Sequence, residues 1–385
     1  MGGFIVIKQI LKNFNIEGIL INVETNTTGN INNTYVATFQ NVDGSTKKYL
    51  IQKINTTVFT EPYKLMKNIE GVTSYLKRQM EKENDHKHQV LEVIKTVDGK
   101  SLCYVENDGE RDYYRIYEFI ENAITYDFSV DTKVVYNTGK AFGNFQKLLR
   151  NYPMSRLTET IKDFHMTDKR YQKLLDDIKI DSKGRVMEVS PEIVFILMRE
   201  DVCSLITDDL GSDELPYRVT HNDTKVNNVM MNTETGDYVA VIDLDTVMPG
   251  SLLFDYGDGI RSTASTAKED ETDLSKVGIN LELFEAYTDG YLSEMAPYIT
   301  YEEVSLMSES IRVITLELAI RFLNDYINGD TYFKINYEKH NLDRTRNQIA
   351  LVKDIESKLD YMHNYILKSY QKYRNTGKAM SLVKK

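Results

Sequence analysis

The chain of 385 residues is long enough for two lobes or two domains, each with a substantial core. Its net charge of −11 argues against a nucleic-acid partner, and its two cysteines, Cys103 and Cys203, are too few and too far apart for a disulfide scaffold or a structural zinc site. No secretory or membrane-spanning segment is predicted, so we expect a cytoplasmic protein without a membrane partner. The sequence leaves the oligomeric state open.

The first third of the chain predicts a small antiparallel sheet with helices. Turn signals such as Asp43-Gly44 and Asp98-Gly99 separate short apolar runs. A helix is predicted over residues 5–16, and a second from an N-cap at Thr60 to about Met80. The predicted strands are 19–24, 34–40, 49–54, 91–97, 101–106 and 112–119.

The remainder of the chain is predicted to be mostly helical. Apolar residues recur there at helical spacing. A loop is expected at 163–168, and a last helix ends near Tyr373. The other predicted helices are 138–149, 168–178, 191–207, 280–297 and 301–328.

The chain is organised around residues 219–261. Two apolar runs, 229–231 and 238–242, flank a polar stretch and predict a β-hairpin with Val229 opposite Ile242. Asn228 and Asp243 then emerge at the same end of the hairpin, and Asp223 lies in the loop before it.

This arrangement is typical of phosphoryl transfer from ATP. Such a site needs a base for the acceptor's proton, here Asp223, and an amide and a carboxylate that hold Mg²⁺, here Asn228 and Asp243. Asp245 is a candidate support for the metal or a water, and Asp255 a candidate brace for the loop. The alternative is that Asp223 and Asn228 only cap turns.

The sequence HNDTKVNN followed by VIDLD resembles the aminoglycoside phosphotransferase and choline kinase superfamily, relatives of the protein kinases. The longer sequence pattern, which continues to FDYGD, is similar to that of the N-acetylhexosamine 1-kinases, and the resemblance covers about residues 22–353. The resemblance implies an α+β, two-lobed, protein-kinase-like fold, with a nucleotide-binding lobe at 1–119 and a catalytic and substrate-binding lobe at 120–385. It also implies ATP and Mg²⁺ as cofactors and phosphorylation of the anomeric hydroxyl of N-acetylglucosamine or N-acetylgalactosamine.

The resemblance further implies the residues of a nucleotide site. Lys53, on the third predicted strand, would contact the phosphates and pair with Glu70 or, less favourably, Glu61. The loop around Gly29 would fold over the phosphates. The crossover Glu118-Phe119-Ile120 would bind adenine through its backbone. From residue type alone, Lys53 could equally be a surface lysine.

An acceptor site is implied in the same way. The stretch ELAIRFLNDYINGDTYF places Arg321 and Tyr332 at sugar-binding positions, and His165 and Asn30 are further candidates for contacts with the sugar. The alternatives are an intrahelical Arg321–Asp325 pair and a core tyrosine. The chain has no tryptophan, although the hexosamine kinases tend to carry one near the sugar.

Three other functions compete with a hexosamine kinase. The first is a kinase for another small acceptor, such as an aminoglycoside or choline, and the second is a silent nucleotide-binding protein. The third is a metal-dependent phosphohydrolase that uses the acidic cluster. The silent protein is expected to lack the base or the metal ligands, but Asp223, Asn228 and Asp243 are all present.

Overall fold

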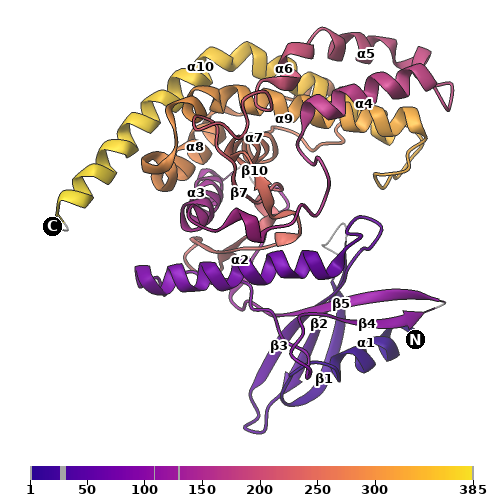
Figure 1. Cartoon of the computed structure of the whole chain (residues 1–385), viewed down its shortest axis with the longest axis vertical. Helices are drawn as coiled ribbons and strands as arrows, with labels where there is room; N and C mark the ends of the chain where they lie inside the picture. The colour runs from indigo at the N-terminus through magenta and orange to yellow at the C-terminus, as the bar shows by residue number, and fades with distance from the viewer. Residues whose placement is uncertain (1, 27–31, 108, 129–130, 384–385) are drawn as a thin grey trace.

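The computed structural model describes residues 2–26, 32–107, 109–128 and 131–383. An N-terminal lobe contains an antiparallel five-stranded sheet, and a C-terminal lobe is mostly helical (Figure 1). The predicted α+β class is therefore confirmed.

The N-terminal sheet lies between two helices, α1 (Gly2–Leu11) and α2 (Pro62–Glu83). Helix α2 crosses the molecule between this sheet and the helical lobe (Figure 1). The strands follow the spatial order β1-β2-β3-β5-β4. Their bounds are β1 (Ile19–Asn26), β2 (Asn33–Gln40), β3 (Thr46–Lys53), β4 (Cys103–Asn107) and β5 (Glu110–Glu118).

The two faces of the sheet belong to different cores. Because side chains alternate along a strand, Tyr49 and Ile51 of β3 pack with α1, whereas Leu50 packs with α2. The α2 core continues into the C-terminal lobe through residues such as Phe145 and Val247. The α2 face of the sheet is therefore the one directed at the other lobe.

Several predicted boundaries differ from the structure. Residues 91–97 form isolated bridges, such as Val93 with Tyr117, instead of a regular strand. The predicted helix 191–207 is divided into α5 (Ser190–Leu197) and α6 (Glu200–Ser204). Helix α2 begins at Pro62, whose fixed φ suits a first helical position, and Thr60 is not its N-cap.

The C-terminal lobe places two small sheets beside a bundle of helices. Helix α9 (Tyr301–Asn328) is buried along most of its length and starts with a capping box between Thr300 and Glu303. The strands are β6 (Ala123–Ile124), β7 (Arg218–Thr220), β8 (Val229–Asn232), β9 (Tyr238–Val241) and β10 (Met248–Gly250). The other long helices are α3 (Thr132–Leu149), α4 (Thr167–Ile180), α7 (Leu252–Thr263), α8 (Leu281–Met295) and α10 (His340–Val383).

Candidate active site

The β8–β9 hairpin holds the predicted metal ligands at one end. Val229 pairs with Val241, one residue from the predicted register, and the Ile242 N–H donates to the Asn228 carbonyl over 2.9 Å. The chain then turns sharply at Asp243, which has a left-handed φ of 57°. Asn228, just before β8, and Asp243, shortly after β9, therefore lie at the same end of the hairpin.

Asp223 lies beside this end of the hairpin. The Asn228 side-chain amide donates to the Asp223 carboxylate (3.0 Å) and to its backbone carbonyl (2.8 Å). Lys225 Nζ lies 2.8 Å from the other carboxylate oxygen, and the Asp223 side chain is 27% exposed. The carboxylate is thus fixed by two neighbours and keeps access to solvent, as a base for an incoming hydroxyl must.

The surroundings of Asp243 suit a cation. Desolvation, together with the negative charges of Asp245 and Asp223, raises the pKa of Asp243 to about 7, although Arg115 and Lys225 oppose this shift. The residue is nevertheless open to solvent. An accessible carboxylate beside an amide oxygen fits Mg²⁺, which prefers hard oxygen ligands and retains several waters. In the described ranges, no cluster of three or more His, Cys, Asp or Glu side chains forms a metal cage.

Buried acids brace the loop that carries Asp223. Asp255, on α7, accepts hydrogen bonds from the backbone N–H groups of His221 (2.8 Å) and Asn222 (2.7 Å). Asp258 accepts one from the Thr224 N–H (3.0 Å) and pairs with an arginine of the same helix. The predicted bracing by Asp255 is confirmed.

The predicted Lys53–Glu70 ion pair is wrong. Lys53 Nζ lies 2.7 Å from Asp112, and Glu70 pairs with Lys95. Glu61, the alternative partner, pairs with a lysine of its own helix. The reason is strand alternation, because Lys53 shares the face of Tyr49 and Ile51, which packs against α1 and away from the other lobe. Its predicted contact with nucleotide phosphates is therefore wrong as well.

Arg115 of β5 provides a cation on the α2 face of the sheet, opposite to the face that carries Lys53. It is 1% exposed and donates to Gln52, its partner on β3, and to both carboxylate oxygens of Asp245 (2.5 and 2.9 Å). Asp245 also accepts from the Asn32 amide (2.7 Å). This buried network joins the N-terminal sheet to the turn that begins with Asp243.

The predicted adenine contacts are only partly accessible. The N–H of Glu118 donates to the Glu92 carbonyl and that of Phe119 to the Lys48 carbonyl, so these two N–H groups are already engaged and are not available as donors to adenine. Gly29 and Asn30 lie outside the described residues.

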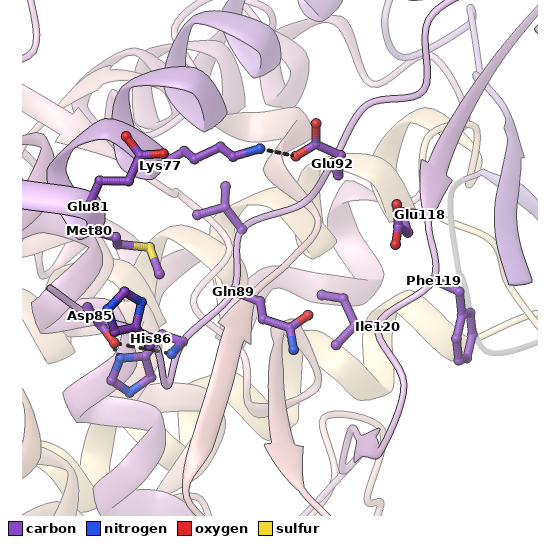
Figure 2. A pocket seen from close by; sticks show the side chains of 12 residues that line it. Lys77, Met80, Glu81, Asp85, His86, Gln89, Glu92, Glu118, Phe119 and Ile120 are labelled. Atoms are coloured by element: carbon purple, nitrogen blue, oxygen red, sulfur yellow. Dashed lines mark hydrogen bonds and ion pairs between the residues drawn. The ribbon is translucent and has the colours of Figure 1, made fainter. Parts of the chain in front are cut away.

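A cavity of about 560 Å³ lies beside the Glu118–Ile120 crossover, against α2 and residues 85–92. Figure 2 shows the ion pair between Lys77 and Glu92 there. None of the lining residues belongs to the 219–261 stretch, so this cavity is separate from the base and the candidate metal ligands.

Arg321 and Tyr332 come together as the acceptor hypothesis requires. The Arg321 guanidinium lies 5.1 Å from the ring of Phe164, 5.9 Å from that of Tyr332 and 5.5 Å from that of Phe333. Tyr332 is 57% exposed and is therefore not a core tyrosine. The ion pair that Arg321 makes is with Glu317, at 3.8 Å, one turn before it in α9.

Asp325 does not form the ion pair with Arg321 that was the alternative to a sugar-binding role. Its carboxylate accepts the backbone N–H groups of Thr331, Tyr332 and Phe333 over 2.8–2.9 Å. It thereby shapes the loop that presents Tyr332.

His165 is not placed as a sugar ligand. It is 5% exposed, and both ring nitrogens contact protein acceptors, Glu317 at 2.9 Å and the Asn222 carbonyl at 3.1 Å. A buried ring without a free nitrogen has no donor for a sugar, so this predicted contact is wrong.

Comparison with known proteins identifies the family. Residues 78–298, more than half of the chain, match the phosphotransferase enzyme family. The chain belongs to this family. Its structure is similar to that of a microcompartment-associated aminopropanol kinase, with a TM-score of 0.60 and 13% identity over 94% of this chain and 98% of the other.

Two further structures have the same fold. An amicoumacin kinase in complex with AMP-PNP, Ca²⁺ and its antibiotic gives a TM-score of 0.59, with 13% identity over 93% of this chain and 94% of the other. A spectinomycin phosphotransferase in complex with ADP and spectinomycin gives 0.56, with 13% identity over 93% and 98%. The phosphotransferase described here therefore has the predicted protein-kinase-like fold.

Sequence reasoning missed two cations of this phosphotransferase. Lys225 follows Asp223 by two positions, and this short spacing is a signal that could have identified it. Arg115 lies 130 residues from Asp245, and only the packing of the lobes reveals their pairing.

In the part of the chain that the structure describes, no helix is long and apolar enough to span a membrane.

Proposed function

We propose that this phosphotransferase is an ATP-dependent kinase that phosphorylates the anomeric hydroxyl of N-acetylglucosamine or N-acetylgalactosamine, with Mg²⁺ as its metal cofactor. The observation that carries the proposal is the meeting of Asp223, Asn228 and Asp243 beside the end of one hairpin. Arg321 and Tyr332 form the candidate acceptor-binding site, called the acceptor arm below. A chain of contacts from Arg321 through Glu317 and His165 links this acceptor arm to the same end of the hairpin. A cytoplasmic location is part of the same proposal.

The residues divide the reaction among them. Asp223 accepts the proton of the sugar hydroxyl while the hydroxyl oxygen forms its bond to the γ-phosphorus. The bond between that phosphorus and the bridging oxygen breaks, and the electron pair leaves with ADP. Lys225, 2.8 Å from Asp223, provides positive charge where the phosphoryl group is transferred. Positioning and charge stabilisation together account for most of the catalysis in such reactions.

Asn228 and Asp243 would hold the metal. Mg²⁺, when bound, neutralises the charge of the nucleotide phosphates. Arg115 keeps Asp245 in place behind Asp243, so the turn carries its charged groups in a fixed arrangement. Arg115 is 1% exposed, so in this proposal it acts by holding Asp245 and not through the phosphate contact that the sequence had suggested for Lys53.

The charge of the acceptor arm favours a neutral acceptor over a cationic one. Burial and the charge of Arg321 lower the pKa of Arg170, although the carboxylates of Glu317 and Asp163 oppose the shift. Arg170 also donates to the Phe164 carbonyl. Amino alcohols, choline and aminoglycosides are cations and are disfavoured near two arginines. A sugar amide and its hydroxyls can accept hydrogen bonds from the planar guanidinium.

A panel of acceptors tests the proposal. We expect ADP release with ATP, Mg²⁺ and either N-acetylhexosamine, and little with choline, aminopropanol or spectinomycin. The Asp223→Ala variant, tested with each acceptor, measures the background. If only a cationic acceptor is phosphorylated, that acceptor and not the sugar is the substrate. ADP release without any acceptor would instead favour the phosphohydrolase.

A further inference from the structure

His165 is held between two hydrogen-bond acceptors. Its Nδ1 lies 2.9 Å from Glu317 Oε1 and its Nε2 lies 3.1 Å from the Asn222 carbonyl oxygen. A neutral imidazole has one N–H group and could satisfy only one of them. The imidazolium form satisfies both, and Glu317, which is fully buried, balances its charge.

The peptide group between Asn222 and Asp223 is fixed at both ends. His165 binds its carbonyl oxygen, and its N–H, which belongs to Asp223, lies 3.3 Å from Nδ1 of His221. A peptide group is planar, so these two contacts set its orientation and the direction in which the Asp223 side chain leaves the backbone.

Asn222 needs such support because it has a left-handed φ of 64°. Its N–H donates to Asp255 (2.7 Å) and its side-chain amide to the Thr246 carbonyl (2.9 Å). Those contacts hold the residue itself. Among the described contacts, only the one from His165 holds its carbonyl.

Glu317 connects the same histidine to the acceptor arm. Its Oε1 contacts His165 and lies 3.8 Å from Arg321 Nη1, and its Oε2 accepts from the Thr167 hydroxyl over 2.7 Å. Glu317 and Arg321 are four residues apart on α9 and therefore lie on one face of the helix. One carboxylate thus touches both the arm and the support of the base.

We propose that His165 is a positioning residue that fixes the Asn222–Asp223 peptide for catalysis, and that Glu317 ties this support to the acceptor-binding Arg321. The inference rests on the proposed roles of Asp223 as base and Arg321 as acceptor ligand.

The charges around the ring agree with the imidazolium form. Burial and the positive charge of Arg321 lower the pKa of His165. The carboxylates of Glu317 and of Asp258, which lies on α7, raise it by more, so that the pKa lies above its ordinary value. Burial raises the pKa of Glu317, but the charge and hydrogen bond of His165, the charge of Arg321 and the hydrogen bond of Thr167 together hold it below its ordinary value. The charged pair is present below the raised pKa of His165 and is lost as the pH rises through that pKa.

The first test needs no substrate. In the full chain with ¹⁵N-labelled histidine, we expect His165 to show two protonated ring nitrogens at pH 7.5, with the signal identified by its loss in His165→Gln. In Glu317→Gln the ring should become neutral. A neutral ring in the wild type would overturn the proposal.

The second test measures kinetics with the acceptor that the wild type uses. His165→Gln and Glu317→Gln should each lower kcat about 10- to 100-fold, because a misplaced base is costly, while the KM for ATP changes less than about twofold. His340→Gln is the matched control, since His340 is also buried with a carboxylate, Asp270, at 3.4 Å. It should lower thermal stability without lowering kcat.

The outcomes separate the two proposals. Unchanged kcat in both variants, or an equal loss in His340→Gln, would overturn the positioning role. If His165→Gln does not fold, Glu317→Gln alone decides. Failure of the wild type to phosphorylate a hexosamine would instead refute the proposed substrate, and the ring-protonation result would stand by itself.

Discussion

Removing Arg115 is expected to weaken the binding of magnesium nucleotide, whereas removing Lys53 is not. The Arg115 guanidinium makes two hydrogen bonds to Gln52 and two to Asp245, all on the sheet face directed at the catalytic turn. Lys53 lies on the other face, where it pairs with Asp112.

The two substitutions should differ clearly in stability. Arg115→Met leaves the carboxylate of Asp245, 3% exposed, without its cation, and breaking a buried pair in this way costs about 3–5 kcal/mol. Lys53→Ala breaks a pair whose side chains are 34% and 21% exposed, and such pairs contribute about 0.2–1 kcal/mol. Because Asp245 then loses both hydrogen bonds from the guanidinium, we also expect Arg115→Met to raise the Kd of magnesium nucleotide about tenfold or more.

A double variant separates stability from function. Arg115→Met with Asp245→Leu removes both charges and should recover much of the lost stability, since an apolar pair of similar size can replace a buried ion pair. It should not recover nucleotide affinity. Thermal denaturation and calorimetric titration with a non-hydrolysable ATP analogue measure the two quantities. Near-normal affinity in Arg115→Met, with a large loss in Lys53→Ala, would refute the reasoning.

Six further substitutions test the candidate site. Asp223→Ala should lower turnover by about two to four orders of magnitude with nucleotide affinity nearly intact, and near-normal turnover would exclude the residue as the base. Asp243→Ala should abolish the magnesium-dependent binding of nucleotide, and Asn228→Ala should weaken it less, as calorimetry at several Mg²⁺ concentrations can measure. Arg321→Ala should raise the KM for the sugar about tenfold or more with an unchanged KM for ATP, and Arg321→Lys should recover little. Asp325→Ala should also raise the KM for the sugar, because the loop that presents Tyr332 loses its acceptor, but only Asp325→Ala should lower the melting temperature strongly.

The sequence was most informative where the chemistry is local. The pairing of the hairpin brings Asn228 and Asp243 together, and Asp223 lies only five residues before Asn228, whose amide binds its carboxylate. The one-residue difference in register did not disturb this result, because both ligands lie just beyond the paired strands.

Prediction failed where the answer depended on contacts between distant elements. The alternation of β3 correctly placed Lys53 with Tyr49 and Ile51, but it could not reveal which face of the sheet is directed at the other lobe. That choice depends on where α1 and α2 pack. The same limitation applies to His165, whose nitrogens are engaged by Glu317, 152 residues away in the chain.

Phosphorus NMR of the reaction product tests the central claim most directly. Wild-type protein with ATP, Mg²⁺ and N-acetylglucosamine or N-acetylgalactosamine should yield a new phosphate resonance coupled to the anomeric proton of the sugar, together with an equal amount of ADP. The Asp223→Ala protein should yield neither. Inorganic phosphate in place of a sugar phosphate, or a phosphate coupled to a proton other than the anomeric one, would contradict the proposal that Asp223 directs the γ-phosphoryl group to the anomeric hydroxyl.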